Sequence, residues 1–382
     1  MPLLLHTADW QIGRTYATFT PENAHPLAEA RLAAVERLAA LATAEGVDAV
    51  LVAGDVFDAQ TVADRTLRRL FNALAGFAGP WLLLPGNHDA ALAESVWTRA
   101  QRLRAVPPNA HLLLRPEPWL DAARGLAVLP APLTQRHTHG DLTAWFDGAD
   151  TPPGLARIGL AHGSVQGLLA EDLDATNPIA PDRTERARLD YLALGDWHGC
   201  KRIGPRCWYS GTPETDRFRN NDSGQALLVQ VAPGAEPQVR ALPVGRYRWQ
   251  QLDRALQVPS DLDGLLATLA TRGADDVLDL TLSGALDLAG RQRLQEALAR
   301  AEASARHVQA DLAALSLQPT DEDLAALQAD GYLGEVIGEL RAAQTSGGED
   351  GAVAQEALAL LCAALAQRQP TAAATTGSEG TR

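Results

Sequence analysis

The chain has little cysteine and no long apolar run. Its three cysteines are odd in number and show no Cys-x-x-Cys spacing, which argues against a disulfide scaffold and against a thiolate zinc site. No apolar stretch reaches the roughly 20 residues that a membrane-spanning helix needs. The first residues lack the basic segment of a signal peptide and read as a strand. We therefore expect a cytoplasmic protein with reduced thiols and no membrane association.

Basic residues are also scarce. The 33 lysines and arginines, all but one of them arginine, are outnumbered by 47 acids, and the formal net charge is −14. This balance excludes a uniformly basic nucleic-acid coat. It leaves room for a local basic groove, because net charge does not determine where the charges lie.

Apolar periodicity predicts alternating strands and helices in the first part of the chain. Strands are expected at residues 2–8, 49–53, 81–84, 125–129, 157–161, 191–194 and 226–231. Helices are expected at residues 28–45 and 62–78. The alternation indicates parallel pairing with right-handed crossovers. Because helices become sparser later, the pattern predicts two packed sheets with helices outside.

The composition shifts near residue 245, where we place a domain boundary. Beyond it, helices are expected at residues 261–271, 288–305 and 321–343, and strands at 277–282 and 307–312. This order predicts a first domain over 1–245 and a small α+β domain over 246–345. The last region, 346–382, follows. A linker is expected over 345–351, then a short helix over 352–369 and a disordered tail over 371–382.

Polar residues follow five of the expected strands. The five groups are Asp9-Trp10-Gln11, Gly54-Asp55-Val56-Phe57-Asp58, Gly86-Asn87-His88-Asp89, Ala161-His162-Gly163-Ser164 and Gly195-Asp196-Trp197-His198. Ligands commonly bind at the carboxyl ends of strands. Asp, Asn and His suit manganese, magnesium, iron or zinc, and a bridging carboxylate suits two-metal hydrolysis. Taken singly, each residue reads as a turn or helix cap; their order and their glycines favour a metal site.

The series resembles the calcineurin-like metallophosphoesterase superfamily, whose pattern is D-x-H, GDxxD, GNH[DE], a lone His and GHxH. It is similar, more narrowly, to SbcD-type DNA repair exonuclease subunits, on the residues His6–Trp10, Pro85–Asp89 and Tyr209–Glu214. The resemblance implies an α/β fold, an α+β sandwich of four layers with two mixed β-sheets flanked by helices. A small α+β cap domain would follow the catalytic domain at its C-terminal side.

The resemblance also implies two divalent ions. Their expected ligands are Asp9, Gln11, Asp55, Asn87, His162, Asp196 and His198. Of these, Asp55 would bridge the ions, Asn87 and His162 would bind the second ion, and Asp9 and His198 the first. His88 would meet the scissile phosphate, stabilising its charge or protonating the leaving oxygen, and Asp89 would orient His88.

Two positions depart from the family pattern. Gln11 replaces the His of D-x-H, and Asp196 replaces the first His of GHxH. Both changes exchange a nitrogen ligand for a potential oxygen ligand. They favour Mn²⁺, with Mg²⁺ or Fe as alternatives, over zinc. They also leave the occupancy of the first site open, because Gln11 could serve as a hydrogen-bonding residue only.

We interpret the chain as a metal-dependent phosphodiesterase, an exonuclease of DNA repair that uses a hydroxide activated by two metals. Candidate DNA contacts, which a solvated loop explains equally well, are Lys201, Arg202, Arg206, Arg217 and Arg219. The resemblance implies an SbcC-like coiled-coil ATPase as partner. A homodimer is a further possibility. The alternatives are a phosphodiesterase of this fold acting on a small nucleotide or a phosphoprotein, and a non-catalytic subunit of an ATPase complex.

Overall fold

The computed structural model describes residues 1–167, 176–326, 332–344 and 348–368. The chain divides into two compact units, Met1–Trp249 and Gln250–Arg382. Among the described helices, none combines the length and the apolar character that crossing a membrane would require.

Across its described residues, the first unit is built on two six-stranded sheets. In spatial order, the first sheet contains β14 (Gln238–Pro243), β13 (Gln225–Gln230), β1 (Leu3–Thr7), β2 (Ala49–Val52), β3 (Trp81–Leu83) and β4 (Ala110–Leu112). The second contains β11 (Lys201–Gly204), β12 (Cys207–Tyr209), β10 (Tyr191–Gly195), β7 (Ala156–His162), β6 (Leu126–Ala131) and β5 (Trp119–Asp121). Each sheet contains parallel and antiparallel pairs, which confirms the expected two mixed sheets.

The two sheets pack against each other through side chains that alternate along each strand. Leu4 lies in the layer between the sheets, together with Leu51 of β2 and Ile158 of β7. Its neighbour Leu5 belongs to the core on the helix side of the first sheet, as the two-residue period of a strand requires. The sandwich therefore has an inner core between the sheets and an outer core under the helices.

His6 of β1 connects the two sheets by hydrogen bonds. Its Nδ1 lies 2.9 Å from the hydroxyl of Tyr191, and its Nε2 lies 3.2 Å from the carbonyl oxygen of Leu194, both on β10. Burial lowers the pKa of His6 to about 3, so the ring is neutral at physiological pH. This histidine is part of the core and not of the metal-binding groups.

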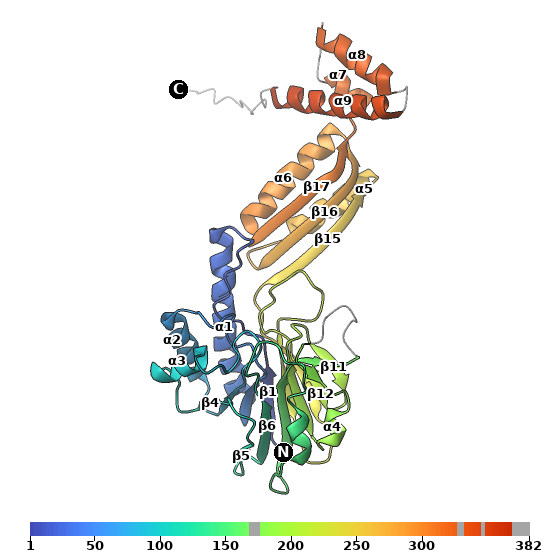
Figure 1. The fold of residues 1–382 in the computed structure, drawn as a ribbon. Helices are drawn as coiled ribbons and strands as arrows, with labels where there is room; N and C mark the ends of the chain where they lie inside the picture. Colours follow the sequence, from blue (N-terminus) through green and yellow to red (C-terminus); the bar gives the residue numbers. More distant parts are fainter. Residues whose placement is uncertain (168–175, 327–331, 345–347, 369–382) are drawn as a thin grey trace, which may run out of the picture. The chain divides into compact units, whose positions relative to one another are not determined.

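Helices cover the outer faces of both sheets. The first sheet is covered by α1 (Pro21–Glu45), α2 (Asp64–Ala73) and α3 (Val96–Arg102), which Figure 1 draws in blue and cyan. The second sheet packs against Phe146 of the 3-10 turn η2 (Ala144–Gly148) and against Ala187 and Leu189, which follow the short helix α4 (Arg183–Arg186). Two short strands, β8 (Ser164–Val165) and β9 (Pro178–Ile179), pair beside it.

The sequence prediction and the structure differ at element ends and in elements that the prediction lacks, among them α3, β12 and β14. The helix expected from residue 28 begins at Pro21, because proline is tolerated in the first turn of a helix. The helix expected over 62–78 is shorter, and its end is a 3-10 turn, η1 (Leu74–Gly76). The edge strands β4, β5 and β11 escape the periodicity because they are short and partly exposed.

The second unit begins with a three-stranded sheet in the order β15 (Arg248–Leu256), β16 (Asp276–Leu286) and β17 (His307–Leu317). The strand β15 starts two residues before the unit boundary at Gln250. It packs against α5 (Pro259–Ala270) and α6 (Leu288–Ser304), so the expected helices and strands form, preceded by the unexpected β15.

Three further helices follow in the second unit. They are α7 (Asp321–Ala326), α8 (Tyr332–Gln344) and α9 (Gly348–Arg368). The expected linker over 345–351 is wrong in its second half, because residues 348–351 form the first turn of α9. Residues 327–331 of the helix expected over 321–343, residues 345–347 of the linker, residue 369 of the expected short helix and the tail 371–382 lie outside the described residues.

Candidate metal centre

The predicted site residues lie on loops with an unusual backbone. Asp9, Gln11, Asp55 and Asp196 have φ angles of 55°, 43°, 52° and 100°. Non-glycine residues rarely occupy this left-handed region, and such strain persists only where surrounding contacts enforce it. The strained positions therefore fall at the strand ends where the sequence pattern places ligands.

Two glycines of the motifs make room for the site. Gly54 has a φ of 90°, and a Cβ atom there would lie 2.2 Å from Nδ1 of His162. A Cβ on Gly86 would lie 2.2 Å from Oδ1 of Asp55. Gly54 is thus needed both for its turn and for space, whereas Gly86 is needed because a ligand candidate lies against its backbone.

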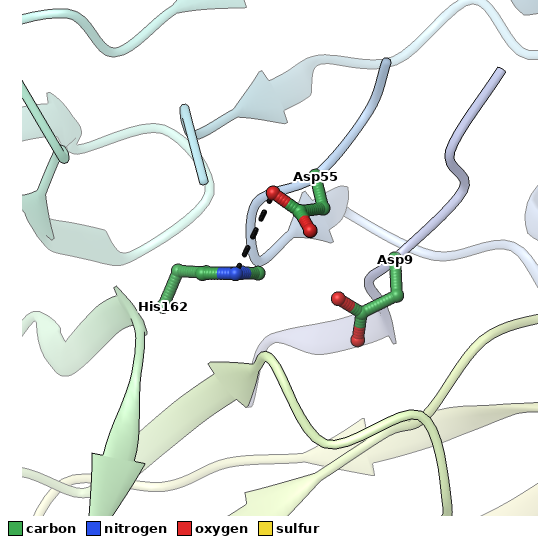
Figure 2. A group of neighbouring side chains, drawn as sticks. All are labelled: Asp9, Asp55 and His162. Carbon is green, nitrogen blue, oxygen red and sulfur yellow. Dashed lines mark ion pairs between the residues drawn. The ribbon is translucent and has the colours of Figure 1, made fainter. Parts of the chain in front are cut away.

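The structure brings three of the predicted ligands into one buried group. Ligand atoms of Asp9, Asp55 and His162 all lie within 4.8 Å of one another. Figure 2 shows the two carboxylates on loops that follow strands, with the imidazole of His162 reaching toward Asp55. Nε2 of His162 lies 3.6 Å from Oδ1 of Asp55 and 3.7 Å from Oδ1 of Asp196. It also lies 2.8 Å from the side-chain amide of Asn87.

The hydrogen bonds around His162 fit a bound cation. Nδ1 lies 2.8 Å from the carbonyl oxygen of Ala53 and donates to it, so in the neutral ring Nε2 carries a lone pair. With the amide oxygen of Asn87 turned inward, that lone pair faces only acceptors. With the amide turned over, its nitrogen donates to His162 and, at 3.3 Å, to Asp55. Lone pairs of carboxylate, amide and imidazole groups that converge in this way are the ligands that a divalent cation binds.

The charges of these side chains also favour a bound cation. Burial raises the pKa of Asp9 to about 6 and also raises the pKa of Asp196. Burial lowers the pKa of His162, but the carboxylates of Asp55, Asp9 and Asp196 outweigh it and raise that pKa to about 9. The site therefore holds a surplus of negative charge, which a divalent cation would neutralise.

His88 lies beside this group without belonging to it. Its backbone N–H donates to Oδ1 of Asp55 at 2.9 Å, and its Nδ1 donates to the carbonyl oxygen of Asp58 at 2.8 Å. Its Nε2 lies 3.9 Å from Oδ2 of Asp55, and its side chain is 30% exposed. The outer ring edge of His88 is therefore accessible to a substrate next to the carboxylate expected to bridge the ions.

Asp89 does not orient His88 in the way expected. Its carboxylate accepts the backbone N–H groups of Gly86, at 2.7 Å, and Phe57, at 3.0 Å, and burial raises its pKa to about 7. It thus joins two of the ligand loops to each other. The contact that holds His88 comes from Asp58, because its carbonyl group points at Nδ1 of the ring.

The remaining predicted ligands, Gln11 and His198, adjoin each other. Their Nε2 atoms are 3.3 Å apart, and the side-chain oxygen of Gln11 accepts from Nη1 of Arg14 at 2.6 Å. The carboxylate of Asp9 accepts the backbone N–H of Asp196 at 3.2 Å. Gln11 therefore presents its amide nitrogen to His198 while its oxygen is engaged.

Asp216 is a residue that the sequence reasoning missed. This carboxylate, 1% exposed, lies 3.0 Å from Nδ1 of His198 and pairs with Arg14 at 3.0 Å and Arg217 at 2.9 Å. Burial would raise its pKa, but His198 and the guanidinium of Arg31 hold it well below the usual range. A carboxylate on the far nitrogen of a histidine fixes the ring for its other contacts. The only sequence signal is its position next to Tyr209–Glu214.

Arg31 is a second residue near the site that the sequence motifs do not predict. It lies on α1 and is fully buried, yet its guanidinium donates to the carbonyl oxygens of Trp10 at 2.7 Å and Asp9 at 2.8 Å. It also donates to the hydroxyl of Thr212 at 3.1 Å. It therefore ties the loop of the first motif to the segment that follows the last one.

The candidate DNA-binding residues have different surroundings. Arg202 pairs with Glu236 at 2.9 Å, and Arg206 donates to backbone carbonyl groups. The ammonium of Lys201 lies 5.5 Å from the centre of the Trp197 ring. Arg217 contacts the site itself, as described above, and Arg219 is exposed.

Two known proteins are similar to parts of this chain. The chain is 44% identical to the SbcD subunit of the nuclease SbcCD of Rhodobacter capsulatus over 93 residues, 23% of this chain and 22% of that protein. It is 25% identical to the uncharacterized metallophosphoesterase YhaO of Bacillus subtilis over 217 residues, 54% of this chain and 51% of that protein. The matches thus span about half or less of these relatives.

One solved structure aligns with part of the chain, and a family profile matches more than half of it. The crystal structure of TT1561 of Thermus thermophilus aligns with 64% of this chain and 99% of its own, at 15% identity and a TM-score of 0.42. The profile of the calcineurin-like phosphoesterases matches residues 2–221, which include all five motif groups. The chain belongs to the calcineurin-like phosphoesterase family.

Proposed function

We propose that this protein is a metal-dependent nuclease that hydrolyses DNA phosphodiesters as an exonuclease of DNA repair. Family membership makes it a hydrolase of phosphoester bonds that binds divalent metal. The observation that carries the proposal is the convergence of Asp55, Asn87 and His162 next to the accessible edge of His88. DNA as the substrate is supported by the 44% identity to a nuclease subunit.

The chain's own residues have separate tasks in this reaction. Asp55, Asn87 and His162 would hold a divalent cation, with Mn²⁺ favoured by the oxygen-rich donor set. When bound, such a cation polarises the phosphoryl group and activates the attacking water. The mechanism then needs a proton for the leaving oxygen. Nδ1 of His88 already donates to Asp58, so a protonated His88 delivers its remaining proton from Nε2.

We extend the proposal to the partners and to the location of the protein. The SbcCD nuclease in the relative's name supports a complex with an SbcC-like ATPase. Arg217 follows Asp216 directly and Arg219 lies two positions further on, which supports a role for both in contacting the DNA backbone near the site. A cytoplasmic location is part of the proposal, because a repair exonuclease must reach the DNA on which it acts.

The test is a cleavage assay with the full chain. Purified protein with Mn²⁺ is given end-labelled linear duplex DNA, closed circular DNA and bis(p-nitrophenyl) phosphate. We expect release of nucleotides from linear DNA, and little release from the closed circle because it has no ends. Cleavage of the small diester without cleavage of DNA would refute the DNA substrate and favour a phosphodiesterase of small nucleotides. Absence of both activities and of bound metal would favour a non-catalytic subunit.

A further inference from the structure

We propose that arginine replaces the first metal ion in this chain. One divalent cation binds among Asp9, Asp55, Asn87 and His162, and the guanidinium groups of Arg14 and Arg217 hold the substrate phosphate where a second ion is expected. That the bound phosphate belongs to DNA rests on the proposed function. The expected number of ions does not depend on it. It follows from how the residues of the expected first site are engaged.

The first argument is the state of Gln11. An amide is a weaker ligand than the imidazole it replaces, and its oxygen is the only atom that could bind a cation. That oxygen accepts from Nη1 of Arg14 at 2.6 Å. The amide nitrogen, which cannot bind a cation, is the atom that faces His198, at 3.3 Å. Gln11 thus turns its donor group toward the place where the ion would lie.

The second argument is the contact between His198 and Arg217. Nη2 of Arg217 lies 2.8 Å from Nδ1 of His198 and 3.5 Å from Nε2. A guanidinium has donors only and keeps its charge at every physiological pH. The shorter of these contacts is at the nitrogen that also faces Asp216. Nε2, the nitrogen left for an ion, faces two donor groups, the amide nitrogen of Gln11 at 3.3 Å and this guanidinium at 3.5 Å.

The third argument is the local charge. A single carboxylate, Asp216, pairs with three guanidinium groups: Arg14 at 3.0 Å, Arg217 at 2.9 Å and Arg31 at 3.7 Å. Around Asp216 itself these cations outnumber the one carboxylate, which favours an anion there. The carboxylates of Asp9 and Asp196 group with His162 instead. Arg31 is buried, but the side chains of Arg14 and Arg217 are 28% and 38% exposed and are accessible to a phosphate. Guanidinium groups bind phosphate oxygens in pairs of parallel hydrogen bonds.

The other end of the site lacks these features. Among the described residues, no arginine donates a hydrogen bond to the side chains of Asp55, Asn87 and His162, and their acceptor atoms converge. One end therefore suits a cation and the other suits an anion. A substrate phosphate could lie between them, with His88 on the cation side.

The first experiment counts ions. The full chain is equilibrated with Mn²⁺, and bound metal is measured by elemental analysis and by titration calorimetry. We expect one ion per chain. Two ions whose affinities lie within a factor of ten would overturn the inference.

Two variants test the assignment of Arg14. In the double variant Gln11→His with Arg14→Ala, an imidazole replaces the amide and the competing guanidinium is gone, so a second ion should bind. A double variant that still binds one ion would overturn the role of Arg14. The control Arg124→Ala, which removes an exposed arginine paired with Asp121, should stay at one ion.

The second experiment tests phosphate binding. We expect Arg217→Ala to raise KM for DNA at least tenfold with Mn²⁺ content unchanged, and Arg217→Lys to lie between it and the wild type, because lysine lacks the paired donors. Circular dichroism checks that each variant is folded. A KM within twofold of the wild type in Arg217→Ala would contradict the proposal.

The two proposals fail separately. If the wild type binds one ion and cleaves no DNA, the proposed nuclease function fails while the ion count stands. If it binds two ions and cleaves DNA, the arginine inference fails and the nuclease function stands.

Discussion

Replacing Gly54 by alanine separates backbone strain from crowding at the metal centre. The φ angle of 90° costs an alanine about 1–2 kcal/mol. The new Cβ would also lie 2.2 Å from Nδ1 of His162. Overpacking of this kind costs about 1–3 kcal/mol. We therefore expect Gly54→Ala to lower the free energy of unfolding of the first unit by about 2–5 kcal/mol, the sum of both effects.

Gly46 provides a matched control. It has a φ of 65° at the end of α1, and a Cβ there would meet no atom within 4 Å. Gly46→Ala should therefore show the backbone cost alone, about 1–2 kcal/mol. The difference between the two variants measures the crowding of His162.

Tryptophan fluorescence during urea denaturation is the suitable assay. All eight tryptophans lie within Met1–Trp249, so the signal reports on the first unit. Calorimetric titration with Mn²⁺ completes the test, because a displaced His162 should weaken metal binding in Gly54→Ala only. Equal free energies of unfolding for the two variants, together with unchanged Mn²⁺ affinity, would refute the reasoning.

Three further predictions follow from the geometry. His88→Ala should keep its bound metal and lose at least about a hundredfold in turnover; wild-type turnover in a steady-state assay would contradict the role of His88. His6, whose pKa falls from 6.5 to about 3 on folding, leaves stability unaffected above pH 6.5 and lowers it by about 1.4 kcal/mol per pH unit as pH falls from 6.5 toward 3. His6→Gln should lose this slope in denaturation curves at pH 7, 6 and 5, and an unchanged slope would count against it. Mn²⁺ should activate the enzyme more than Zn²⁺ in matched assays, and the reverse order would contradict the oxygen-rich donor set.

The sequence predicts those parts of the site that local chain features determine. Asp55 and Asn87 follow neighbouring parallel strands of the first sheet, so their meeting follows from strand order. His162 ends β7 of the second sheet, so its approach to them depends on how the two sheets pack. Gly54 and Gly86 are recognisable from the motifs as special positions. The reason that Gly86 must be a glycine cannot be recognised from the sequence, because its close approach to Asp55 depends on how two loops pack.

Other parts depend on contacts between distant segments. Arg31 lies in the middle of a helix, and its partners come from two other loops, one of them about half the chain away. Asp216 has no motif of its own, and its importance arises from the three guanidinium groups and the imidazole of His198 that surround it. Likewise, Asp89 follows His88 in the chain, yet its carboxylate turns to backbone N–H groups. Spacing in a sequence does not fix the direction of a side chain.

The buried guanidinium of Arg31 has a consequence for how the protein responds to its surroundings. Its hydrogen bonds to the loop of Asp9 and to Thr212 come from a group that never loses its proton under physiological conditions. Several neighbours in the centre change protonation between acid and alkaline pH, but this anchor does not. The loop of the first motif and the segment that follows the last motif therefore keep their spacing while the charge between them varies. Gain and loss of metal with pH would then be reversible, because the frame that receives the ion persists without it.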